Sequence, residues 1–154
     1  MRPFAGGIIV ALAVLAIGTT KYIGLGIPVI VQSFELQLPP SDFAVKMAFT
    51  IVTLAAGFKG GEVTPLFFIG AALGSALSLV IPLPVGLLAG MGFVAVFAGA
   101  TNTPLACMLM GIELFGAESG IYMAIACVVS YIFSGHNSIY SRQKIGEPKQ
   151  ARFS

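Results

Sequence analysis

The chain has 154 residues, of which 57% are apolar and only 9% are charged. Soluble domains carry roughly 25% charged residues, so this supply cannot cover a water-facing surface, and a soluble globule is excluded. The net charge of +2 argues against nucleic-acid binding, since most of the basic excess lies in the last thirteen residues. The composition predicts an integral membrane protein.

Uncharged stretches mark the helical segments. Charged residues are absent from residues 3–20 and from the fifty residues 63–112. A bilayer-spanning helix needs about 20 mainly apolar residues, so the prolines of the longer stretch must divide it into several helices. We predict helical segments at the start of the chain and at residues 41–58, 66–81, 85–100, 105–115 and 119–134, with a less regular stretch at residues 23–34. Several are shorter than a full span, which is typical of all-α membrane proteins with short, broken and tilted helices.

Two stretches rich in glycine and proline are candidates for breaks at membrane depth, GFKGGEVTP at residues 57–65 and GATNTP at residues 99–104. Irregular backbone survives there only where protein covers it or where it lines a watery cavity. The alternative is that both stretches are ordinary surface loops.

Glycine pairs four residues apart predict close helix packing. Gly70 with Gly74, and Gly86 with Gly90, would let helix backbones approach one another in lipid. Glycine is also simply commoner in membrane helices, so each pair alone is ambiguous. Together the pairs indicate a packed helical bundle.

The two ends of the chain suggest its orientation. Residues 142–154 form a basic tail, which the positive-inside rule places in the cytoplasm. Arg2 suggests that the other end is cytoplasmic too, which predicts a multi-pass protein that crosses the cell membrane an even number of times.

No set of residues in the sequence resembles an enzyme site. His136 has no partner at metal-ligand spacing, and Cys107 and Cys127 lie in apolar runs, where we expect them to be small core residues. No nucleophile–base pair or phosphate loop is present. We therefore expect neither catalysis nor a metal or cofactor.

The segment GGEVTP predicts an anion site. Gly60 and Gly61 allow unusual backbone conformations, Thr64 is a natural N-cap, and Pro65 falls where a first helical turn would begin. A helix N-terminus has unpaired N–H groups and positive dipole density, so it can bind an anion without a formal charge. The amides of Glu62 and Val63 would be the ligands, and the Thr64 hydroxyl could add a donor.

Three charged side chains in these segments have open roles. Glu62 could couple proton movement to anion movement, because it repels an anion when ionised and donates a hydrogen bond when protonated; alternatively it pairs with Lys59 at a membrane surface. For Glu113 we favour a structural hydrogen bond to backbone over a transport role. We expect Lys46 to extend to the interface.

Four segments, in order, resemble the CLC family of chloride channels and anion/proton antiporters. GGEVTPLFFIGAALG resembles its signature, a glycine pair followed by x-x-x-P and an apolar helix. GATNTPLACMLMGIELFG resembles a downstream helix that begins T-x-x-P-L and has a glutamate near its end. Met1-Arg2-Pro3 with Gly6-Gly7 resembles the opening of the second half of the fold, and NSIYSRQ resembles the last short helix.

The resemblance implies roles for individual residues. The amides of Glu62 and Val63 would be central anion ligands, and the hydroxyl of Tyr140 would be a further donor at the inner gate. Residues 103–115 and 119–134 would form much of a homodimer interface, with Glu113 near it and one pore per subunit.

The motif G-E-V-T-P resembles the bacterial branch of the family that exchanges fluoride for protons, in which this glutamate and this threonine take part in transport. The common family pattern has Phe where Val63 stands, and this departure favours the fluoride branch. Fluoride is small and strongly hydrated, so hydroxyl and protonated carboxyl donors suit it.

The first half of the family's fold does not occur in the sequence, including its external gating glutamate in a G-[KR]-E-G-type loop. Residues 1–141 resemble the second inverted-repeat half of a CLC domain, and residues 142–154 would be a cytoplasmic tail. We expect the chain to need the missing half before it can transport halide and protons. Alternatives are a chloride channel of the same family and a non-transporting membrane scaffold.

Overall fold

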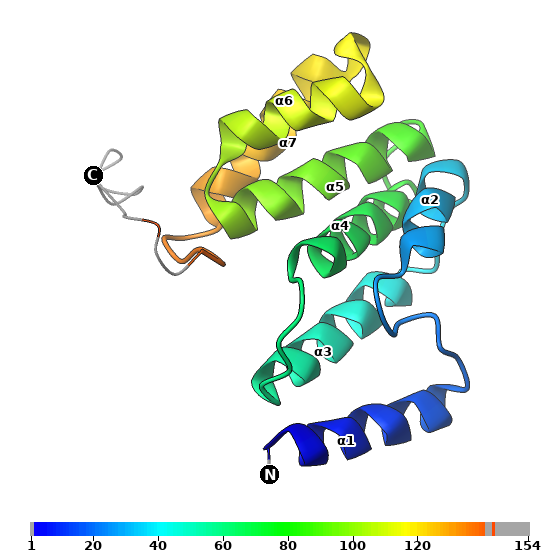
Figure 1. Ribbon diagram of the computed structural model, residues 1–154. Coiled ribbons are helices and arrows are strands. Elements are labelled where there is room, and N and C mark those ends of the chain that lie inside the picture. The colour runs from blue at the N-terminus through cyan, green and yellow to red at the C-terminus, as the bar shows by residue number, and fades with distance from the viewer. Residues whose placement is uncertain (1, 141–142, 144–154) are drawn as a thin grey trace.

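The computed structural model describes residues 2–140 and residue 143, and every regular element in them is helical (Figure 1). In chain order the elements are α1 (Arg2–Ile17), α2 (Ile27–Glu35), α3 (Ser41–Ala55), α4 (Val63–Leu77), α5 (Val85–Thr101), α6 (Pro104–Phe115), the 3-10 turn η1 (Ala117–Ser119) and α7 (Gly120–Phe133). The α-helices have 9 to 17 residues, as expected for short helices. No helix in this part of the chain is both long and apolar enough to cross a membrane.

The predicted segments agree with the structure best in the last three helices, where every boundary is correct to within one residue. The less regular stretch predicted at residues 23–34 is wrong for most of its length, because residues 27–35 form α2. Gly26 takes a left-handed conformation with φ 67° at the N-cap, and Pro28 lies in the first turn, where no N–H donor is needed. These two residues start a helix instead of preventing one.

Close contact between α4 and α5 forms the centre of the molecule. A Cβ added to Gly70 would lie 2.4 Å from the Gly92 carbonyl oxygen, and one added to Gly74 would lie 2.0 Å from that of Leu88. The two backbones therefore touch, which confirms the packing predicted from this glycine pair. The helices run antiparallel, since contacts later in α4 are with residues earlier in α5.

The second glycine pair faces other neighbours. A Cβ on Gly86 would lie 3.0 Å from the Phe34 carbonyl oxygen in α2, and one on Gly90 would lie 3.0 Å from the Met123 side chain in α7. Small residues on α5 thus bring α2 and α7 close to it, in addition to α4.

Apolar side chains from α4 to α7 fill the core. Cys107 and Cys127 are 1% and 0% exposed and free, so both are small core residues, as predicted. Phe67 of α4 stacks on Phe93 of α5 with ring centroids 4.0 Å apart, which adds to the packing of the two helices.

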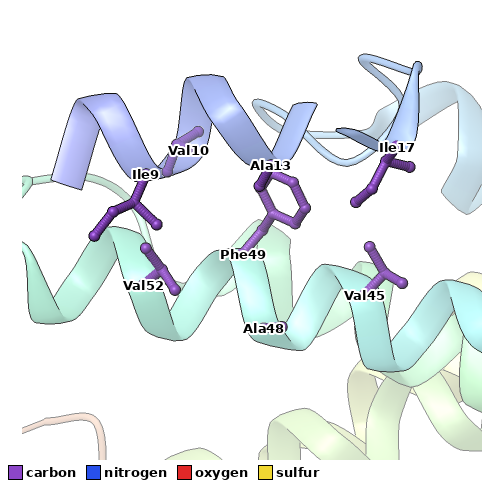
Figure 2. Close-up of a pocket in the computed structure, with 8 residues that line it drawn as sticks. All are labelled: Ile9, Val10, Ala13, Ile17, Val45, Ala48, Phe49 and Val52. Carbon is purple, nitrogen blue, oxygen red and sulfur yellow. The ribbon is translucent and has the colours of Figure 1, made fainter. Parts of the chain in front are cut away.

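The first helix packs mainly on α3. Figure 2 shows α1 lying along α3, with Ile9 and Ala13 facing Val52 and Phe49 across a groove of about 280 Å³. The start of α1 is close to the end of α3, since a Cβ on Gly6 would lie 2.2 Å from that of Ala56. Its other side is exposed and apolar.

Candidate functional site

The chain leaves helical structure at both of the predicted glycine- and proline-rich stretches, although each non-helical stretch is shorter than expected. Residues 56–62 between α3 and α4 are not helical. The second break is limited to Asn102 and Thr103, with Asn102 at a left-handed φ of 57°. Gly60 and Gly61 are exposed, neither has a positive φ, and a Cβ on either would meet nothing within 4 Å. Their expected conformational role is therefore wrong, and their main effect is to leave the loop without side chains.

The helix α4 begins at Val63, two residues before Pro65, where the motif predicts the first turn, and three before the predicted segment of residues 66–81. Its N-cap is Glu62, which has helical φ and ψ of −84° and −19° and makes no side-chain capping bond. Thr64 as N-cap is therefore wrong, because it lies within the first turn. Pro65 is the third helical residue, a position whose N–H has no intrahelical acceptor in any helix, so the helix can start ahead of the proline.

Three backbone amides at this helix end are available to a ligand. The first intrahelical bond joins the Leu66 N–H to the Glu62 carbonyl oxygen at 3.4 Å. The N–H groups of Glu62, Val63 and Thr64 have no protein acceptor among the described residues. They extend from the positive end of the helix dipole, which favours an anion.

The carboxylate of Glu62 is not paired with Lys59. The described part of the chain contains one ion pair, between Lys21 and Asp42. Glu62 is half-buried beside the free amides, and Lys59 is exposed on the preceding loop. The surface-pair alternative for Glu62 thus lacks its contact.

Tyr140 follows a segment, residues 138–139, that is attached by hydrogen bonds to the end of α5. The Ile139 N–H donates to the Ala100 carbonyl oxygen at 2.9 Å, and the Ser138 hydroxyl donates to the Thr101 carbonyl oxygen at 3.3 Å. The Tyr140 side chain is 49% exposed, and within the described residues no bond joins it to the start of α4.

The packing of α4 on α5 brings this segment and the free amides to one end of the helix pair. Gly70 lies opposite Gly92, and Gly74 lies opposite Leu88. Extended back to the start of α4, the same antiparallel register puts Val63 level with the last turn of α5, to which the Tyr140 segment is attached. Residues far apart in sequence thus share one end of the bundle.

The prediction that Lys46 extends to the membrane interface is wrong. It is 3% exposed, and its ammonium group donates to the carbonyl oxygens of Tyr22 at 3.0 Å and Gly24 at 2.6 Å. Internal acceptors from a distant segment replace water, so the side chain folds inward. The only signal in the sequence is a lysine in the second turn of a mainly apolar helix.

The structural hydrogen bond predicted for Glu113 is also wrong. Its side chain is exposed on α6, next to the exposed Leu114 and one turn from Leu109, and it makes no hydrogen bond within the described residues. No group of three or more His, Cys, Asp or Glu side chains in this part of the chain could hold a metal ion.

Short helices, a chain break that ends in free helix amides, and an apolar exterior define a class: the helical membrane domains of ion channels and secondary transporters. The sequence model described as "Voltage gated chloride channel" matches residues 1–135. The chain belongs to this family of membrane proteins, the CLC family.

Individual relatives agree with this assignment. A chloride/fluoride channel protein of Pseudomonas syringae pv. tomato is 58% identical over 99% of the chain and 35% of its own length. The voltage-gated ClC-type chloride channel ClcB of Salmonella dublin is 34% identical over 92% of the chain and 37% of its length. The crystal structure of a CLC-type fluoride/proton antiporter superposes with a TM-score of 0.86 at 37% identity, over 92% of the chain and 36% of that structure.

The superposition confirms the predicted fold as part of a CLC domain. The chain spans about a third of the length of these relatives.

Proposed function

We propose that this chain forms the second half of a CLC-type domain that carries a small halide, fluoride or chloride, across the cell membrane. The observation that carries the proposal is the start of α4, where three amides without protein acceptors among the described residues lie within the family match. The names of two of these relatives support it, since one includes both ions and the other is a fluoride/proton antiporter.

The anion ligands in this proposal are backbone and hydroxyl donors. The amides of Glu62 and Val63 bind the ion, the Thr64 hydroxyl adds a donor, and the Tyr140 hydroxyl approaches from the segment attached to α5. Partial charges at a helix end attract an anion without holding it as tightly as a formal charge, which suits transport. Exposed Gly60 and Gly61 leave the approach free of side chains.

Glu62 is the proton-coupling group. Its carboxyl lies next to the amides, so it competes with the anion when ionised and donates to it when protonated. The lack of a pairing contact with Lys59 in the described chain leaves it available for this exchange.

The partners we propose are the first half of the fold, a second copy of the chain and the lipid bilayer. Large apolar side chains on α6 and α7 are exposed, among them Leu105 at 71%, Ile121 at 74% and Phe133 at 84%. This surface, within residues 103–115 and 119–134, fits the proposed homodimer interface. In this arrangement residues 1–141 cross the membrane several times. The basic tail, residues 142–154, is cytoplasmic and lies outside the described residues except for Gln143.

Ion flux on the complete transporter tests the proposal. Reconstituted in liposomes loaded with fluoride or chloride, it should release halide and move protons in the opposite direction. Glu62→Gln should abolish the proton movement, because the side chain can no longer exchange a proton. Ion-selective electrodes and external pH report the two fluxes separately.

Glu118→Gln is the matched control, since Glu118 is an exposed carboxylate away from α4, and it should leave proton coupling intact. Proton movement that persists in Glu62→Gln contradicts the proton role. Chloride flux without protons in the unmodified protein favours the channel alternative, and flux of neither ion contradicts the proposal as a whole.

A further inference from the structure

A cavity of about 260 Å³ lies between α3 and the loop that leads into α4. Lys46 and Thr50 line it from α3, and Gly60, Gly61 and Pro65 line it from the loop and the start of α4. One side of α3 therefore faces the segment that leads into the proposed anion ligands.

The buried Lys46 side chain brings a charge to this cavity. Its ammonium group has three donors, of which the carbonyl oxygens of Tyr22 and Gly24 accept two. It also lies 5.1 Å from the ring centroid of Phe68, in the second turn of α4. These contacts hold the charge beside α4.

Within the described residues Lys46 has no carboxylate partner. Their only ion pair joins Lys21 to Asp42. Carbonyl oxygens solvate an ammonium group but do not neutralise it, and a buried charge without a counter-charge is costly. An anion held at the other side of the same cavity would be that counter-charge.

We propose that Lys46 sets the anion affinity of the site at α4, an inference that rests on the function proposed above. Lys46 and Pro65, which lies in the first turn of α4, line one cavity, so the positive potentials of the ammonium group and of the helix end add beside the anion site. In a low-dielectric interior a unit charge acts over several ångströms, so contact with the ion is not required. Lys46 raises the anion affinity by electrostatic attraction at a distance and does not contact the ion.

The test separates the charge from the hydrogen bonds. In the complete transporter, Lys46→Gln keeps an N–H donor for the carbonyl oxygens and removes the charge. We expect the KM for halide to rise about tenfold, with the maximal rate changed by less than about twofold. Lys46→Arg keeps the charge and should restore the KM. Lys59→Gln removes an exposed lysine of the adjoining loop, and solvent screening should keep its effect on KM under about twofold.

A second pair of variants decides the matter if Lys46→Gln does not fold. Thr50 is one turn after Lys46 on the cavity wall, and its hydroxyl donates to the Lys46 carbonyl oxygen at 2.8 Å. Thr50→Glu places a carboxylate where it can neutralise the ammonium group, so it should raise the KM as Lys46→Gln does. Thr50→Gln has nearly the same shape without the charge and should not.

An unchanged KM in folded Lys46→Gln, or equal KM values in the two Thr50 variants, overturns the inference. A KM that rises as much in Lys46→Arg as in Lys46→Gln also overturns it, because the effect would then be structural. Calorimetric titration with sodium fluoride distinguishes the two proposals. Anion binding that depends on Lys46 in a protein without flux contradicts the transport proposal alone, and binding that does not depend on Lys46 contradicts the inference alone.

Discussion

Asp42 connects the segment after α1 to the first turn of α3. Its carboxylate is 2% exposed, accepts a hydrogen bond from the Tyr22 hydroxyl at 2.6 Å and pairs with Lys21. Burial raises the pKa of Tyr22, in the connection outside the helices, to about 12, and the hydrogen bond and charge of Asp42 act in the same direction. The hydroxyl therefore stays protonated and keeps donating over the physiological pH range.

Tyr22→Phe should lower the free energy of unfolding by about 1 kcal/mol, since Asp42 loses one hydrogen bond and keeps Lys21. A raised pKa means that the protonated hydroxyl stabilises the folded state fully below pH 10.0 and that this contribution is lost as the pH rises toward about 12. The penalty of the variant should accordingly be constant below pH 10.0 and shrink above it. Thermal denaturation in detergent at several pH values measures this.

Tyr122→Phe is the control, because Tyr122 is 43% exposed. Equal melting shifts in the two variants would mean that the Asp42 bond contributes nothing to stability.

At the scale of elements, the contact between α4 and α5 determines where the candidate site lies. Gly74→Ala should destabilise the protein by about 1–3 kcal/mol, because the new Cβ meets the backbone of Leu88 and not a side chain that can move aside. The melting temperature in detergent checks this. Gly7→Ala on α1 meets only the edge of Phe58 at 3.9 Å, so it should melt like the unmodified protein. A Gly74→Ala variant that also does so would show that the helix pair can separate at little cost.

The sequence predicts elements well where apolar runs end at clear boundaries, as in α5 and α6. It fails at α2, within the stretch predicted as less regular, where Gly26 and Pro28 suit the N-cap and the first turn of a helix. At the site, the motif locates the helix end near Glu62 but not its first residue.

The inward direction of Lys46 could not have been predicted. It depends on carbonyl oxygens of residues 22 and 24, which tertiary structure brings to α3. Local sequence shows an amphipathic side chain near a helix end, for which an interface is the ordinary expectation.

At the scale of the whole molecule, apolar surface remains uncovered on opposite sides. The α1 side chains Phe4 and Leu15 are each 78% exposed, and α6 and α7 expose a second surface. The chain spans about a third of the length of its relatives. The isolated chain should therefore pass no fluoride or chloride in liposomes, whereas the complete transporter should pass at least one of them. Halide flux through the isolated chain would contradict the proposal that the transport site needs the first half of the fold.

The proline at the third position of α4 limits how an ion can be surrounded. With no N–H on Pro65, this helix end offers three amide donors, and all of them extend from the same end of one helix. They can cover one hemisphere of an ion and not the other. A bound halide would therefore lie at the boundary between the start of α4 and another part of the protein, and its residence time would report how firmly those two parts are held together.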